Sequence, residues 1–132
     1  MTLVDTSAWV DFLRASGTNA HQAVRDLIDR DAVVSTTDVV VMEVLAGARD
    51  DEHHDRLRRM LARCELVPIV GLADYEEAAS LYRRCRRAGA TVRTLTDCLI
   101  AAVALRADLD VLHADRDFEV LAQHTGLRIF DG

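Results

Sequence analysis

Apolar residues occur in two patterns along the chain. Some form short runs rich in β-branched residues, and others recur every three or four residues over longer stretches. The short runs predict strands at residues 2–4, 32–35, 66–70, 111–113 and 127–130. The longer stretches predict helices at residues 7–14, 20–30, 38–48, 53–64, 73–88, 95–107 and 117–124. Alternating strands and helices are typical of βαβ units, so the predicted fold class is α/β: a three-layer α/β/α sandwich with a mostly parallel central sheet.

The length and composition fit one ordinary domain. Half of the 132 residues are apolar and 29% are charged, which favours a compact fold over a disordered chain. We therefore predict that residues 1–132 form a single domain. The first residues lack a basic segment followed by a long apolar one, and no stretch of about 18 apolar residues occurs, so we expect a cytoplasmic protein without a membrane partner.

The numbers of cysteines and lysines argue against several kinds of functional site. The 3 cysteines are odd in number and show no CxxC spacing, which indicates neither a disulfide framework nor a zinc site. Cys98 lies in an apolar run and is predicted to be a core residue. All 16 basic residues are arginine, which excludes mechanisms that need a lysine, such as a Schiff base or a P-loop.

Two acids follow predicted strands. Asp5 comes directly after the first strand, and Asp115 comes just after the strand at residues 111–113. Ligands of open parallel sheets bind outside the carboxyl ends of the strands, which makes both residues candidates for a site. Each also has a structural interpretation: Asp5 as a helix N-cap, Asp115 in an Asx-turn, and the nearby Asp117 as the N-cap of the last helix.

Two further acids lie on apolar helix faces. Glu43 is flanked three and four positions away by small or apolar residues, and Asp97 has Ile100 and Ala101 at the same spacings. A buried carboxylate is costly unless it is paired or binds a cation, so we predict that both serve a site. The alternatives are an arginine that neutralises Glu43, and stabilisation of Asp97 by the helix dipole in the first turn.

Together these four acids predict a metal centre. Clustered carboxylates raise one another's pKa values unless cations are present, and hard oxygen ligands select Mg²⁺ or Mn²⁺ over zinc. Such ions catalyse phosphoryl chemistry. Ser7 and Thr96 are neighbours that could position a water molecule, although helix capping is the favoured role of both residues. Arg116 could contact a substrate phosphate or pair with a carboxylate.

Four segments carry a resemblance to a known family. They are VDTSAW (4–9), VMEVLAG (41–47), TDCLIAA (96–102) and LHADRDF (112–118). In this order and spacing the chain resembles a PIN-domain ribonuclease, specifically a VapC-type toxin of a type II toxin–antitoxin system. The resemblance implies a single PIN-like nuclease domain over residues 1–132. Its metal ligands would be Asp5, Glu43, Asp97 and Asp115, with Asp117 as a candidate fifth ligand; Asp115 is favoured over Asp117 because it lies nearer the strand end.

The same resemblance implies cleavage of structured RNA, such as a tRNA or rRNA loop, inhibition of translation or growth, a VapB-type antitoxin and a homodimer. The net charge of −6 disfavours RNA binding, but two divalent ions would change it to −2. A basic run at residues 83–87, followed by Arg93, could contact phosphates or form a solvated helix face.

Other functions remain open. One is a PIN nuclease that processes RNA as housekeeping, and another is a non-catalytic binding module with a structural divalent ion. A dehalogenase-type phosphatase needs the motif Asp-x-Asp after the first strand. It is disfavoured because the residues at this place are Asp5, Thr6 and Ser7. A receiver domain is disfavoured because the chain contains no lysine.

Overall fold

A computed structural model describes residues 1–131, so the last residue of the predicted domain, Gly132, lies outside the described part. Four strands form one sheet: β1 (Thr2–Val4), β2 (Val34–Thr36), β3 (Glu65–Leu66) and β4 (Asp110–Leu112). Their order is β3-β2-β1-β4, and every neighbouring pair is parallel. The carboxyl ends of all four strands therefore lie at the same edge of the sheet.

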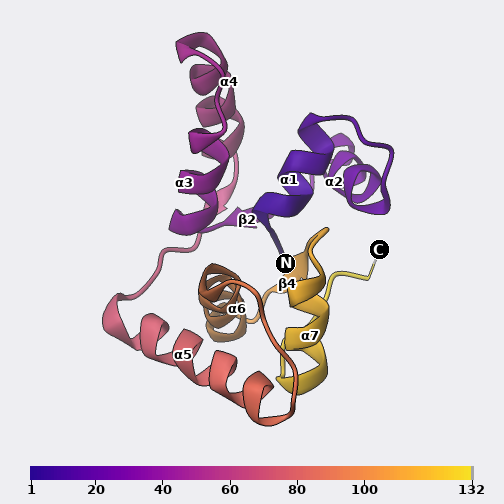
Figure 1. Ribbon diagram of the computed structural model, residues 1–132. Helices are drawn as coiled ribbons and strands as arrows, with labels where there is room; N and C mark the ends of the chain where they lie inside the picture. Colours follow the sequence, from indigo (N-terminus) through magenta and orange to yellow (C-terminus); the bar gives the residue numbers. More distant parts are fainter. Residues whose placement is uncertain (132) are drawn as a thin grey trace.

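Helices follow the strands along the chain and cover the sheet. They are α1 (Thr6–Leu13), α2 (Asn19–Asp29), α3 (Asp38–Ala46), α4 (Asp51–Ala62), α5 (Gly71–Arg87), α6 (Leu95–Ala107) and α7 (Arg116–His124). Figure 1 shows α1 and α2 on one side of the strands and α5, α6 and α7 on the other. The predicted α/β/α sandwich with a parallel sheet is confirmed.

The core is densest around α6. Its residues 98–104 are all buried, because small and branched apolar side chains occur on every face of this helix. Cys98 is fully buried here, and burial raises the pKa of its thiol to about 12. A thiol that stays protonated is unreactive, which agrees with its predicted role in the core.

The third and the final predicted strands differ most from the observed elements, whereas the ends of the predicted helices agree to within about two residues. The third strand ends at Leu66 because Pro68 has no N–H for the ladder, although Val67 N–H still donates to Thr36 O (2.8 Å). The final strand is reduced to a single parallel bridge between Val111 and Ile129. Finally, α3 is shorter than predicted and ends at Ala46, and Gly47 caps it.

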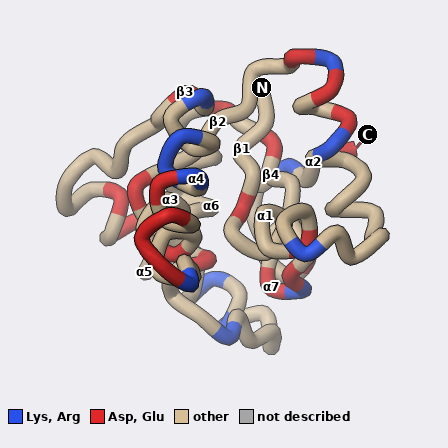
Figure 2. Tube along the Cα trace, turned by 90° about the horizontal axis from the view of Figure 1, so that it is seen from above, with Lys and Arg blue, Asp and Glu red and all other residues tan. Residues whose placement is uncertain are grey.

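Helices α3 and α4 form a hairpin that projects from the rest of the molecule (Figure 1). Figure 2 shows both acidic and basic residues beside the α4 label. Along α4 the acids Asp51, Glu52 and Asp55 come first and the arginines Arg56, Arg58 and Arg59 follow, in the order that the helix dipole favours. Among the described residues, none of the helices combines the length and the apolar character that a membrane span requires.

Candidate active site

Two of the predicted acids lie at the same edge of the sheet because their strands are neighbours. β1 and β4 pair in parallel with Val4 opposite Leu112, and Asp5 N–H extends this pairing by donating to Leu112 O (2.9 Å). Asp5 then starts α1, and Asp115 starts α7 a few residues after β4. Both acids therefore lie at the carboxyl edge of the sheet, where sites of open α/β folds are found.

Three carboxylates form a compact cluster at this edge. Asp97, Asp115 and Asp117 each offer an oxygen atom, and these atoms all lie within 4.8 Å of one another. Asp97 comes from the first turn of α6, where the hydroxyl of Thr94 accepts a hydrogen bond from its N–H (3.4 Å). Asp97 and Asp117 are buried, with 8% and 2% of their surface exposed, while Asp115 is partly exposed. Two helix starts thus bring the acids together.

Asp5 is almost completely buried, with 3% of its surface exposed. Its Oδ2 accepts hydrogen bonds from the N–H of Ser7 (3.0 Å) and from the Ser7 hydroxyl, which confirms its role as the N-cap of α1. Burial, together with the negative charge of Glu43, raises the pKa of Asp5 despite these bonds. Capping therefore uses only one oxygen of this carboxylate.

Glu43 differs from its prediction as a buried carboxylate, because it is only half-buried. On α3 the buried residues are Val39, Val40 and Val44, so Glu43 lies at the border of the apolar face and not at its centre. Its Oε1 accepts a hydrogen bond from the Thr6 hydroxyl (2.8 Å). Within residues 1–131 no arginine pairs with Glu43. The alternative expectation, that an arginine neutralises this carboxylate, is therefore wrong for the described residues.

The pKa values of the clustered acids diverge. Burial raises the pKa of Asp97 to about 8, and the charge of Asp5 and the hydrogen bond with Asp117 add to the effect. Burial acts on Asp117 in the same direction, but hydrogen bonds from Arg93 and Thr94 outweigh it and lower the pKa of that carboxyl. The cluster therefore holds one carboxyl that resists ionisation beside one that is fixed in its ionised form.

Two carboxylate oxygens in the described part of the chain are buried without any hydrogen-bond partner, Asp5 Oδ1 and Asp97 Oδ2. Unpaired buried oxygens are costly, because each has lost its contact with water and gained nothing in exchange. A cation bound to either acid would satisfy its unpaired oxygen. A cation at the cluster would also offset the negative charges that add to burial in raising the pKa of Asp97. The acidic cluster could therefore bind a divalent metal ion.

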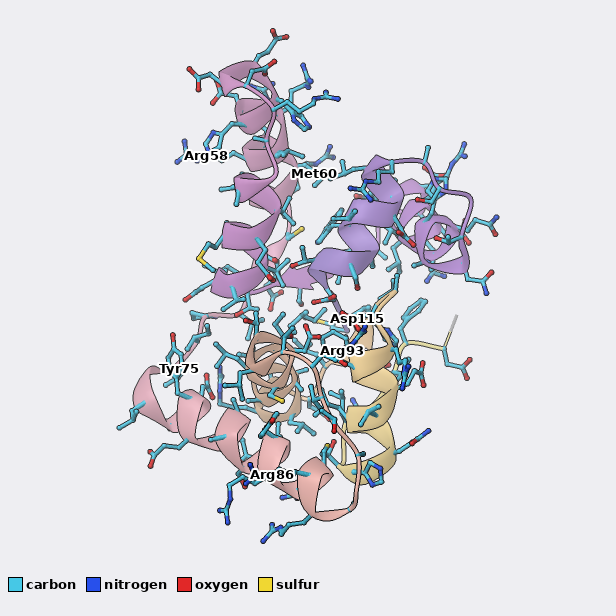
Figure 3. The ribbon with its side chains drawn as sticks, viewed as in Figure 1. Arg58, Met60, Tyr75, Arg86, Arg93 and Asp115 are labelled. Carbon is cyan, nitrogen blue, oxygen red and sulfur yellow. The ribbon has the colours of Figure 1, made fainter. Side chains whose placement is uncertain are left out.

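Arg93 is the residue whose role the sequence did not reveal. Its guanidinium donates to Asp115 Oδ1 (2.9 Å) and to Asp117 Oδ1 (3.2 Å). Arg93 and Asp115 are labelled in Figure 3. Arg116, the arginine expected between the acids, is exposed, and the structure records no ion pair for it over residues 1–131. The loop before α6 brings Arg93 to α7, and this contact leaves no periodic signal in the sequence.

The two polar neighbours take different positions. The Ser7 hydroxyl donates to Asp5 and accepts a hydrogen bond from Ala114 N–H (2.9 Å), so it joins the start of α1 to the loop after β4. Thr96 is half-buried, and Thr94, not Thr96, is the cap of α6. Neither Ser7 nor Thr96 is itself the cap of a helix, and of the two only Ser7 contacts a predicted metal ligand.

The last helix is capped by Asp115 and not by Asp117. Asp115 Oδ1 accepts a hydrogen bond from Asp117 N–H (2.9 Å). Asp117 instead faces the loop before α6, where the backbone N–H groups of Arg93 (3.0 Å) and Thr94 (3.2 Å) donate to its Oδ2. Both acids thus lie in the cluster, and the preference for Asp115 as the main distal ligand stays a prediction.

Known proteins resemble this chain over nearly its whole length. The family described as PIN domain matches residues 2–123. Ribonuclease VapC11 of Mycobacterium tuberculosis is 42% identical over 129 residues, which cover 97% of this chain and 96% of that protein. The enzyme class that the resemblance of the four segments implied, a ribonuclease, is therefore confirmed.

Solved structures share the fold at lower identity. A toxin–antitoxin complex from Klebsiella pneumoniae has a TM-score of 0.70 at 23% identity, covering 89% of this chain and 90% of that one. VapC20 of Mycobacterium tuberculosis, a sarcin–ricin loop cleaving toxin, has a TM-score of 0.70 at 19% identity, covering 97% and 99%. These structures agree in fold, and the family model over residues 2–123 together with the 42% identity to ribonuclease VapC11 shows that the chain belongs to the PIN-domain family and, within it, to the VapC ribonucleases.

Proposed function

We propose that the chain is a metal-dependent endoribonuclease that acts as the toxin of a toxin–antitoxin pair. Asp5, Glu43, Asp97 and Asp115 would hold Mg²⁺ or Mn²⁺, with Asp117 as a fifth ligand. The observation that carries this proposal is the pair of buried, unpartnered oxygens, Asp5 Oδ1 and Asp97 Oδ2. An oxygen-only set of this kind suits a hard divalent cation better than zinc.

The residues around the acids have separate tasks in this proposal. Ser7 holds Asp5 and the loop that precedes Asp115, and the Thr6 hydroxyl orients Glu43. A divalent ion bound here would stabilise negative charge on the phosphoryl group and lower the pKa of an attacking water molecule. Rigid placement of these oxygens by strand ends and helix starts limits the reorganisation that the reaction would require.

The proposed substrate is structured RNA, a tRNA or rRNA loop, whose cleavage would inhibit translation or growth. Proteins read RNA sequence mainly on unpaired bases, so a loop is the accessible target. The structural neighbour VapC20 is a sarcin–ricin loop cleaving toxin, which supports a loop as the substrate. Because the proposed substrate is cellular RNA, the proposed place of action is the cytoplasm.

The proposed partners are a VapB-type antitoxin and a second copy of the chain. The related toxin–antitoxin complex supports an antitoxin. Four large apolar side chains between residues 66 and 75 are exposed, which supports a further protein interface. They are Leu66, Val70, Leu72 and Tyr75.

The test is cleavage of total cellular RNA by the purified chain, freed of any partner, with Mg²⁺ or Mn²⁺ and with EDTA. Asp97→Asn keeps size and removes a ligand charge, so discrete cuts should require metal and vanish in this variant. Asp26→Asn, an equal change at an exposed site on α2, should cleave like the wild type. Cleavage by Asp97→Asn at the wild-type rate would refute the site. Metal-induced stabilisation without any cuts would point to a structural ion in a binding module.

A further inference from the structure

The guanidinium of Arg93 lies among the oxygens that would bind a metal ion. Its Nη2 is 2.9 Å from Asp115 Oδ1, and its Nε is 3.2 Å from Asp117 Oδ1. Both acids belong to the cluster whose oxygens lie within 4.8 Å of one another. Figure 3 shows Arg93 and Asp115 together near the start of α7. A permanent positive charge thus lies at the cluster, because arginine stays protonated in proteins.

The oxygens that Arg93 contacts have limited capacity for another partner. Asp115 Oδ1 accepts both the guanidinium and the backbone N–H of Asp117. A divalent ion that bound this oxygen would displace the guanidinium, since two cations in contact with the same atom repel strongly. Asp5 Oδ1 and Asp97 Oδ2 have no such occupant and remain available to an incoming ion.

Removal of the guanidinium would not release Asp117. The backbone N–H groups of Arg93 and Thr94 donate to Asp117 Oδ2 at 3.0 Å and 3.2 Å, whichever way the Arg93 side chain points. The Arg93 side chain is 64% exposed, so it can rotate into solvent without disturbing the core. The ligand therefore keeps its place when the side chain leaves.

We propose that Arg93 is a built-in competitor of the divalent ion, which neutralises Asp115 and Asp117 in the metal-free chain and leaves them when the ion binds. This inference rests on the metal site of the proposed function. Arg93 acts through the two acids and is a positioning residue. Its presence weakens metal binding and stabilises the metal-free fold, because it offsets repulsion among the acids.

The test is titration of Mn²⁺ into EDTA-treated, dialysed protein by calorimetry, together with thermal unfolding in EDTA. Arg93→Gln should bind Mn²⁺ about tenfold or more tightly than the wild type, because a neighbouring cation is gone. It should also melt at a lower temperature in EDTA, and this loss should disappear at saturating Mn²⁺. Arg93→Lys keeps the charge and should bind within about threefold of the wild type.

Arg128→Gln is the matched control. Arg128 is also more than half exposed and also pairs with two acids, Asp108 (2.6 Å) and Asp110 (2.8 Å), which lie outside the cluster. Its loss removes the same charge, and screening by salt should keep the change in Mn²⁺ affinity below about threefold.

The outcomes separate this inference from the proposed function. Equal or weaker Mn²⁺ binding by Arg93→Gln, relative to Arg128→Gln, would overturn the competition and leave the metal site intact. Absence of Mn²⁺ binding in the wild type and in every variant would remove the metal site itself, and the competition with it.

Discussion

Asp97 and Asp117 share a hydrogen bond, yet their pKa values are shifted in opposite directions. Burial and the charge of Asp5 raise the pKa of Asp97, whereas donors from Arg93 and Thr94 lower that of Asp117. In the metal-free chain the shared proton therefore belongs to Asp97. A bound cation would reverse this state, because it favours the ionised form of every ligand.

The metal-free fold should lose stability as the pH rises. A carboxyl whose folded pKa is raised stabilises the fold below its unfolded pKa, and this contribution is lost as the pH passes through the folded pKa. For Asp97 this loss occurs between about pH 4 and about pH 8. Urea unfolding in EDTA should show that the free energy of unfolding decreases by at least about 1 kcal/mol across this pH window.

Asp97→Asn should remove most of this decrease and should be more stable than the wild type near the upper end of the window. Asp26→Asn, an exposed change on α2, should keep the full dependence. A wild-type profile that stays flat, or that rises with pH, would contradict the assignment of the proton to Asp97.

The start of α5 should depend on one ion pair with α6. Arg106 donates to buried Asp74 at 3.0 Å and 2.9 Å, and this contact lowers the pKa of the carboxyl. Arg106→Met should reduce the free energy of unfolding by about 1–2 kcal/mol, because it leaves a buried charge without its partner and Arg106 is itself partly screened by solvent. Denaturant unfolding at neutral pH measures the loss.

Asp74 also predicts how the stability of the fold changes in acid. Because its pKa is lowered in the folded chain, the stabilisation by the pair of Asp74 and Arg106 is present above the unfolded pKa and is lost as the pH falls through the folded pKa.

The control for Arg106→Met is Arg56→Met, which breaks an exposed pair with Glu52 and should lower the free energy of unfolding by less than about 0.5 kcal/mol. An equal loss in the two variants would mean that burial of Asp74 contributes nothing.

Ser7→Ala should damage both the fold and the site. The hydroxyl of Ser7 bonds to Asp5 and to Ala114 N–H, so its loss removes two contacts at the carboxyl edge. We expect a decrease of about 1–2 kcal/mol in the free energy of unfolding. RNA cleavage should fall about tenfold or more at temperatures where the variant is folded, because a ligand loses its orientation.

The control is Ser16→Ala, which removes an exposed hydroxyl bond to Asp11 O (3.0 Å). It should change stability by less than about 0.5 kcal/mol and leave cleavage unchanged. Wild-type cleavage by Ser7→Ala would show that Asp5 needs no orientation from its neighbour.

Leu72→Glu should weaken self-association if the exposed apolar segment at residues 66–75 forms the dimer. Leu72 is 72% exposed, so the substitution should not lower the melting temperature of the monomer. A charge buried in an apolar interface is costly, and the dimer dissociation constant should rise about tenfold or more. Light scattering across a dilution series measures it, and Val33→Glu, at another exposed apolar position, should dimerise like the wild type.

Much of this protein follows from its sequence. The alternation of strand and helix patterns predicted the parallel α/β/α fold, because side-chain periodicity reports which face of each element is buried. Asp5 and Asp115 were found because chain polarity places the residues after parallel strands at one edge of the sheet. Asp97 stood out because an acid on an apolar helix face requires a partner.

Only the tertiary structure decided the rest. The half-buried position of Glu43 depends on how far α3 is covered by its neighbours, which helical periodicity does not specify. The contacts of Arg93 with Asp115 and Asp117 join a loop to a helix more than 20 residues away, and such loops have no repeating pattern. The opposite pKa shifts of Asp97 and Asp117 likewise arise from burial and from donors that packing supplies, because electrostatic environment is a property of the assembled fold and not of local sequence.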